Sequence, residues 1–104
     1  MVALSGSVQN LVGNDYPDFV LVATPTQPFY TGDALTTTSS VYFPSSSGSI
    51  TGSFPQTQTS GVLVAFSGNF TANGIFQEVV FIPTIIPNVA SIGLGELLFP
   101  ILNP

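Results

Sequence analysis

Carboxylates are the only side chains in this sequence that carry charge at neutral pH, at Asp15, Asp18, Asp33, Glu78 and Glu96. The 104 residues include no Lys, Arg, His or Cys, and the formal net charge is −5. A serine nucleophile therefore has no imidazole or amine to act as its base. A glycosidase requires only two carboxylates, but it also requires a deep cleft, which so short a chain seldom forms. We expect no enzymatic activity and no cofactor.

The missing cations also limit what the protein can bind. Nucleic acids are held chiefly through phosphate contacts from Lys and Arg, so we expect no nucleic-acid partner. A buried carboxylate would have no cationic side chain within the chain to pair with. Adhesion to any other surface must therefore come from strands, apolar patches and the C-terminal residues.

Oxygen ligands gather in the turn-like segment Gly13–Asp18, which contains Asn14, Asp15 and Asp18. Carboxylate and amide oxygens suit Ca²⁺, but the spacing and the glycine of an EF-hand loop are missing. Turns also prefer Asp and Asn, because these side chains hydrogen-bond to nearby backbone. We therefore interpret these residues, and Asp33, as solvated turn residues and predict no metal site.

Three further patterns have a plain structural interpretation. Asn69-Phe70-Thr71 fits the N-glycosylation sequon, which is common by chance. Glu78 lies among apolar residues in a predicted strand, and we interpret it as an exposed charge at a sheet edge. The Thr-x-Thr pairs that begin at Thr24 and Thr57 are explained by β-propensity.

Three tyrosines, Tyr16, Tyr30 and Tyr42, have Asn or Gln near them. Aromatic rings supply stacking surface, so these residues could line a shallow sugar-binding face. The preferred interpretation is that they close the ends of the fold with their hydroxyls in water, because scattered surface aromatics are normal.

The elements that must position these residues are predicted to be strands. Gly (10) and Pro (9) interrupt the chain throughout, so helix signals are weak. Short runs of β-branched and aromatic residues, bounded by Gly, Pro, Asn and Ser, indicate strands. These runs are Ala3–Val12, Phe19–Thr24, Ser40–Phe43, Ser49–Phe54, Val62–Phe70, Ile75–Ile82 and Val89–Leu98.

Turn signals lie between several of these runs. Ser45-Ser46-Ser47-Gly48 predicts a turn, and Asn73-Gly74 predicts a two-residue hairpin. Gly52 and Gly68 predict β-bulges, and Pro25–Ser39 predicts a loop with one short edge strand. About seven short strands at this spacing predict an all-β fold, either a single immunoglobulin-like β-sandwich or a small antiparallel barrel.

The segment Val79–Leu102 is almost wholly apolar. Prolines, Asn88 and Glu96 interrupt it and no Lys or Arg flanks it, so we expect no membrane span. We predict a β-sandwich domain at residues 1–98 and an apolar C-terminal tail at residues 99–104. The tail either joins a neighbouring subunit or packs three copies around an axis, or else it forms the last core strand of its own subunit. The residues predicted to contact other subunits are Leu97, Leu98, Phe99, Ile101 and Leu102.

Three segments carry a resemblance to a known group of proteins: Leu4-x-Gly6-x-Val8, Ser47-Gly48-Ser49-Ile50-x-Gly52-x-Phe54 and Phe76–Ile82. Together they resemble the small β-sandwich modules of bacteriophage virions, which occur in tail fibres and among capsid decoration (cement) proteins. The resemblance implies an immunoglobulin-like sandwich, a homotrimer and attachment to the capsid exterior. The chain departs from many of these modules in having no Lys or Arg.

Composition and resemblance together favour a non-enzymatic virion structural protein, a capsid decoration protein on the particle exterior. Its expected partners are itself, as a homotrimer, and the major capsid protein or another virion protein. The alternative is a receptor- or glycan-binding module of a tail fibre, a baseplate or a secreted adhesin. A weaker alternative is a filament subunit that polymerises by strand exchange through Phe99–Leu102. A receptor binder should expose Tyr or Phe beside Asn, Gln or Asp in a groove, whereas a decoration protein should have no such concave aromatic site.

Overall fold

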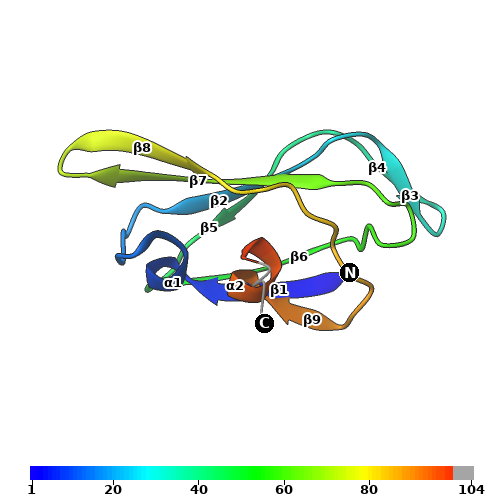
Figure 1. The fold of residues 1–104 in the computed structure, drawn as a ribbon, viewed down its shortest axis with the longest axis horizontal. Coiled ribbons are helices and arrows are strands. Elements are labelled where there is room, and N and C mark those ends of the chain that lie inside the picture. Colours follow the sequence, from blue (N-terminus) through cyan, green and yellow to red (C-terminus); the bar gives the residue numbers. More distant parts are fainter. Residues whose placement is uncertain (100–104) are drawn as a thin grey trace.

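Two β-sheets pack face to face in the computed structural model, which describes residues 1–99 (Figure 1). One sheet has the strand order β5 (Val41–Pro44), β2 (Val20–Pro25), β7 (Val64–Ala72) and β8 (Ile75–Val80). The other has the order β6 (Ser49–Phe54), β1 (Val2–Ser7) and β9 (Ser91–Gly93). The predicted all-β sandwich is confirmed.

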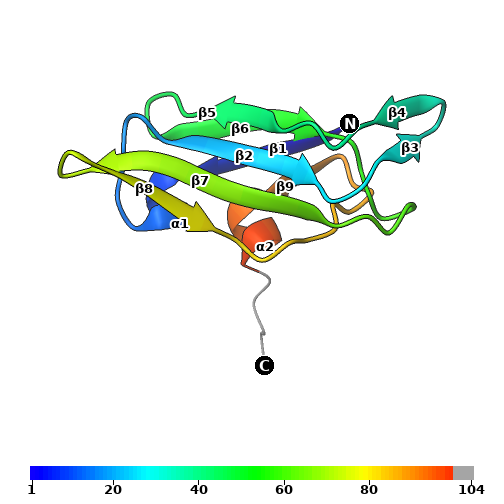
Figure 2. The ribbon, with the colours of Figure 1, turned by 90° about the horizontal axis from the view of Figure 1, so that it is seen from above.

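A separate hairpin of β3 (Phe29–Thr31) and β4 (Ala34–Thr36) extends from one end of the sandwich (Figure 2). It occupies the segment in which only one short edge strand was predicted. This extra pair raises the number of strands above the predicted seven. Gly32 has a φ of 61°, the left-handed conformation that this tight connection requires.

Both predicted tight turns are confirmed. Asn73 and Gly74 have φ values of 54° and 78°, and they join Ala72 to its partner Ile75 in a two-residue hairpin. Ser47 and Gly48, with φ values of 52° and 79°, turn the chain from β5 in one sheet to β6 in the other. Each connection needs two consecutive residues with positive φ, which Asn and Gly adopt at low cost.

The strand predicted at Ala3–Val12 is wrong beyond Ser7, where helix α1 (Val8–Val12) begins. The Ser7 hydroxyl accepts a hydrogen bond of 3.1 Å from the Asn10 N–H, and Gly13 ends the helix with a φ of 83°. Capping satisfies backbone groups that a helix end leaves unpaired, so this single turn is stable at the end of the sandwich.

The strand predicted at Val89–Leu98 is also wrong at its end, where helix α2 (Leu94–Leu98) follows β9. Leu94, Leu97 and Leu98 are all buried, and their i, i+3, i+4 spacing places them on one helical face. The helix lies on the side of the sandwich away from β5 (Figure 2). There Leu94 packs directly against Gly6 of β1 and closes the core.

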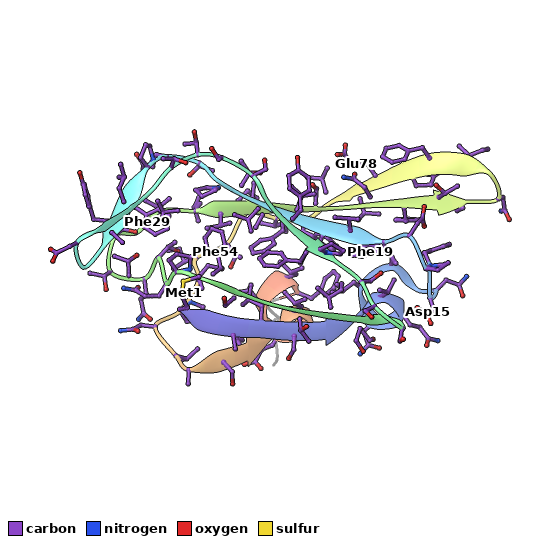
Figure 3. All side chains as sticks on the ribbon, turned by 180° about the vertical axis from the view of Figure 1, so that it is seen from behind. Met1, Asp15, Phe19, Phe29, Phe54 and Glu78 are labelled. Carbon is purple, nitrogen blue, oxygen red and sulfur yellow. The ribbon has the colours of Figure 1, made fainter. Side chains whose placement is uncertain are left out.

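Phenylalanine rings fill the space between the sheets, including Phe19 and Phe54 (Figure 3). Gly52 and Gly68, predicted to be bulges, instead lie in continuous ladders opposite Leu4 and Leu21. A Cβ atom on Gly68 would stand 2.5 Å from the ring of Phe19, and one on Gly52 would overlap the ring of Phe43. These two glycines therefore make room for buried rings, and the bulge prediction is wrong.

Substitution of Gly68 tests this packing. Gly68→Ala should lower the free energy of unfolding by about 1–3 kcal/mol, because its methyl group meets the Phe19 ring in a filled core. Gly95→Ala is the matched control, since a Cβ there has no neighbour within 4 Å in helix α2. Chemical denaturation of both variants measures the difference, and equal losses would contradict the packing argument.

Candidate functional site

The outer face of the four-stranded sheet combines aromatic, polar and charged side chains. Side chains alternate along each strand, so the register of the ladders defines which residues face away from the core. They are Tyr42 and Pro44 on β5, Val20, Val22 and Thr24 on β2, Ala65, Ser67, Asn69 and Thr71 on β7, and Phe76, Glu78 and Val80 on β8. Glu78 is the only charged residue on these four strands and points outward (Figure 3).

An open groove of about 260 Å³ lies on this face. Its lining residues are Asp18, Val20, Tyr42, Asn69, Phe70, Thr71 and Phe76. Tyr42 belongs to the first strand of the sheet and Phe76 to the fourth, so about 14 Å of sheet separates their strands. Val20 and Asn69, which are paired across the two central strands, lie between them. The lining of this open groove therefore comes from all four strands of the sheet.

Aromatic rings stand at both ends of the groove. The exposed fraction is 64% for Tyr42 and 69% for Phe76. Phe76 lies opposite Thr71 in the β7–β8 ladder, so a hydroxyl group neighbours the ring. Exposed rings beside polar groups offer both a flat apolar surface and hydrogen-bonding partners to a ligand.

Asp18 joins the loop before β2 to β7 at one end of the groove. Its Oδ1 accepts a hydrogen bond of 3.1 Å from the Thr71 N–H. Hydrogen bonding by the Thr71 side chain, and then by its backbone N–H, lowers the pKa of Asp18. The carboxylate is therefore held in place, charged and exposed to solvent, where it can accept further hydrogen bonds.

Asn69 contributes a polar atom that has no partner in the described chain. Its Oδ1 is buried from solvent and makes no hydrogen bond. A buried polar atom without a partner costs about 1–3 kcal/mol. Asn69 itself is one of the residues that line the groove.

The lining of the groove carries few ionisable side chains. Asp18 is the only one of its lining residues that is charged at neutral pH, and the chain contains no His, Lys, Arg or Cys to act with it. Within residues 1–99, no three His, Cys, Asp or Glu side chains come together as a metal site would require. What the groove offers is stacking surface, acceptors and hydroxyl groups.

The three carboxylates predicted in turns do not come together in one site. Asp15 is exposed and lies against Gly48, whereas Asp18 is turned toward Thr71. Asp33 is exposed beyond Gly32, in the β3–β4 hairpin. Their interpretation as exposed turn residues is confirmed. Glu78 is likewise exposed on the edge strand β8, as predicted.

The three tyrosines have different surroundings. Tyr16 stacks on Phe70 with ring centroids 4.3 Å apart and packs against the core. Tyr30, on β3, is 66% exposed, and only Tyr42 lines the groove. Phe76 was missed as a candidate, although the Asn73-Gly74 turn determines the hairpin register that places it opposite Thr71.

The residues predicted to contact other subunits differ in their surroundings. Leu97 and Leu98 are buried in the core of their own chain, with exposed fractions of 4% and 3%. Phe99 is 42% exposed and meets Phe81 edge to face, with 5.6 Å between ring centroids. Ile101 and Leu102 lie outside the described residues. The subunit contact itself stays a prediction.

No protein-family model matches the chain, and no curated protein sequence matches it. The resemblance to virion modules therefore stays a prediction. In the part of the chain that the structure describes, no helix is both long and apolar enough to span a membrane.

Acid titration tests the role of Asp18. Because its pKa is lowered in the folded state, its hydrogen bonds stabilise the protein above the unfolded pKa of about 3.9, and this contribution disappears as the pH falls through the folded pKa. The melting temperature of Asp18→Asn should therefore fall below that of the wild type near neutral pH, and the two should converge in acid.

Asp33→Asn is the matched control, because it removes the same charge from an exposed turn. Thermal unfolding from about pH 2 to pH 7 covers the relevant range. A gap that is constant with pH for Asp18→Asn, or the same for both variants, would contradict the assigned hydrogen bond.

Proposed function

We propose that the protein is a non-enzymatic module that binds neutral glycans through the groove on the four-stranded sheet. The observation that carries this proposal is the pair of exposed rings, Tyr42 and Phe76, with Asp18, Asn69 and Thr71 placed between and beside them. The alternative function expected from the sequence is thereby favoured over capsid decoration, because a concave aromatic site is the feature that separates the two.

Sugar rings match this arrangement in two ways. Their C–H faces pack on the flat side of aromatic rings, for which Tyr42 and Phe76 are exposed. Their hydroxyl groups can donate to the exposed Asp18 carboxylate. The strands that carry Tyr42 and Phe76 are about 14 Å apart, so an oligosaccharide is needed to reach both rings.

The negative charge of the chain restricts which glycans the groove can bind. The chain has a net charge of −5 and no cationic side chain, and Asp18 lies in the groove itself. Sialylated, sulfated or phosphorylated sugars would place a second negative charge beside this carboxylate without any compensating cation. The ligand class is therefore a neutral oligosaccharide, presented on the surface to which a virion fibre or a secreted adhesin attaches.

Capsid decoration is the second proposed function, supported by a different observation. Exposed apolar side chains continue from β8 through the segment that follows it, at Ile75, Phe76, Val80, Ile82, Ile85 and Val89. Such a surface is typical of contact with another protein. In this role the protein would be a homotrimer that packs on the major capsid protein at the virion exterior.

Glycan binding by the whole chain tests the first function. An array of neutral and acidic oligosaccharides, followed by calorimetry, should identify a neutral ligand. Phe76→Ala and Tyr42→Ala should each weaken it about tenfold, since a stacked ring contributes about 0.5–1.5 kcal/mol beyond its buried area. Tyr30→Ala is the matched control, because Tyr30 is as exposed as Tyr42 but lies on β3.

Two results would overturn the proposal. One is an array on which no neutral glycan binds, and the other is a ligand whose affinity falls as much in Tyr30→Ala as in Tyr42→Ala. Circular dichroism of the three variants checks that each is folded, which their exposure leads us to expect.

Removal of residues 99–104 tests the second function. If the C-terminal residues attach the protein to particles or to sister subunits, the truncated chain should lose sedimentation with capsids and fall to a lower mass in light scattering. Deletion of Asn103 and Pro104 alone is the control, since it leaves every apolar residue of the segment in place. Unchanged mass and unchanged attachment after the longer deletion would rule this role out.

A further inference from the structure

Strand β8 forms an open edge of the four-stranded sheet. It pairs with β7 on one side, and no described strand pairs with its other side (Figure 2). Both of its faces are also exposed, with exposed fractions of 62% for Ile75, 69% for Phe76 and 73% for Val80. An unpaired edge of a sheet presents a row of backbone donors and acceptors to other chains.

This edge lacks the features that usually protect one. Natural sheets block their edges with Lys, Pro, bulges or a covering segment. The chain has no Lys, the six residue pairs between β7 and β8 run without a bulge, and the first proline after the turn is Pro83, beyond the strand. Glu78 is the only charge on β8. The edge is therefore open to a further strand along its whole length.

The backbone groups that point to this edge follow from the ladder. The Phe81 N–H donates to the Phe66 carbonyl over 3.0 Å, across the core side of the β7–β8 pair. Hydrogen-bonded and non-bonded pairs alternate along an antiparallel ladder. Odd-numbered residues of β8 therefore bond to β7, and Phe76, Glu78 and Val80 direct their N–H and C=O groups outward.

We propose that a second copy of this chain pairs with this edge, β8 against β8 in antiparallel orientation, about a two-fold axis at Glu78. Each outward-facing residue then meets an outward-facing partner: Phe76 lies opposite Val80 of the second copy, and Glu78 lies opposite Glu78. Each chain donates three N–H groups to the other, so all the free groups of the edge are satisfied. The two four-stranded sheets become one sheet of eight strands.

Phe76 and Val80 face each other in this register and not in its neighbours. The apolar pair of Phe76 and Val80 forms twice, once on each side of the axis, and cross-strand pairs of this kind stabilise sheets. An axis at Gln77 would place Phe76 opposite Glu78. An axis at Val79 would place Glu78 opposite Val80 and leave Phe76 opposite Ile82, which lies beyond the end of β8. A shift by one residue would join an outer face to an inner one.

Other edges of the sandwich are poorer candidates. β5 has four residues and ends in Pro44, and β9 has three residues. β6 is as long as β8, but Ser49, Thr51 and Ser53 form its exposed face. Only β8 combines length, a regular ladder and exposed apolar side chains on an edge that is free in the described chain.

The paired sheets would present both grooves on one continuous face, since a two-fold axis perpendicular to the sheet keeps the outer faces together. If the grooves bind glycans, as proposed above, the dimer gains avidity for a surface that displays many copies of the ligand. The pairing itself does not depend on any ligand, so it can be tested without one.

Glu78 provides the test, because the axis brings two like charges together. Sedimentation equilibrium of the full chain without glycan should show a monomer–dimer equilibrium. Glu78→Gln should tighten the dimer about 1.5- to 5-fold, the effect of removing a like-charge pair across a ladder. Glu96→Gln is the matched control, since it removes the same charge from an exposed position in helix α2 and should leave the equilibrium unchanged.

A charge exchange distinguishes this two-fold pairing from any other contact. In an equal mixture of wild type and Glu78→Lys, native mass spectrometry should show heterodimers above the one-half expected from random pairing, because Glu then faces Lys. A wild-type chain that stays monomeric at about 1 mM, a trimer, or a random mixture would overturn the proposal. Because no glycan is present, each of these results leaves the groove proposal to its own test.

Discussion

Packing of phenylalanine rings over glycines is the interaction on which this sandwich depends. Phe19 covers Gly68 and Phe43 covers Gly52, so each ring takes the volume that a side chain at the glycine position would need. Each buried ring contributes about 1.5–3 kcal/mol by leaving water. A chain without cations has no ion pairs between its own side chains, and it has no disulfides. Apolar burial and the backbone ladders must therefore provide its stability.

The absence of cationic side chains also determines which contacts the surface can make. Without Lys, the edge of β8 has no positive charge to discourage pairing, and its one carboxylate, Glu78, stands among exposed apolar residues. Asp18 accepts its hydrogen bond from the backbone N–H of Thr71, and the chain has no cationic side chain that could pair with it. Contacts with other molecules must then use aromatic stacking, small polar groups and free strand edges, which are the features concentrated on the outer face of the four-stranded sheet.

Local signals predicted most of the strands and both tight turns, because period-two patterns and positive-φ residues act over a few positions. The same signals failed to predict the local structure where packing against the rest of the chain determines it. The spacing of Val8, Leu11 and Val12, repeated at Leu94, Leu97 and Leu98, is helical, but each helix is a single turn inside a stretch rich in strand formers. Thr57, which was attributed to β-propensity, lies outside the strands and is fully buried, where its Oγ1 accepts a 2.8 Å hydrogen bond from the Ile86 N–H.

The sequence by itself determined the all-β class, the net negative charge and the absence of Lys, Arg, His and Cys side chains, because these depend only on composition and short-range pattern. The tertiary structure alone determined which residues come together to line the groove. Asp18, Tyr42, Asn69 and Phe76 come from a loop and three strands, and they meet because β5, β2, β7 and β8 pair in that order and register. Nothing in the local sequence specifies that order. It follows from which faces must be buried together, which is a property of the whole chain.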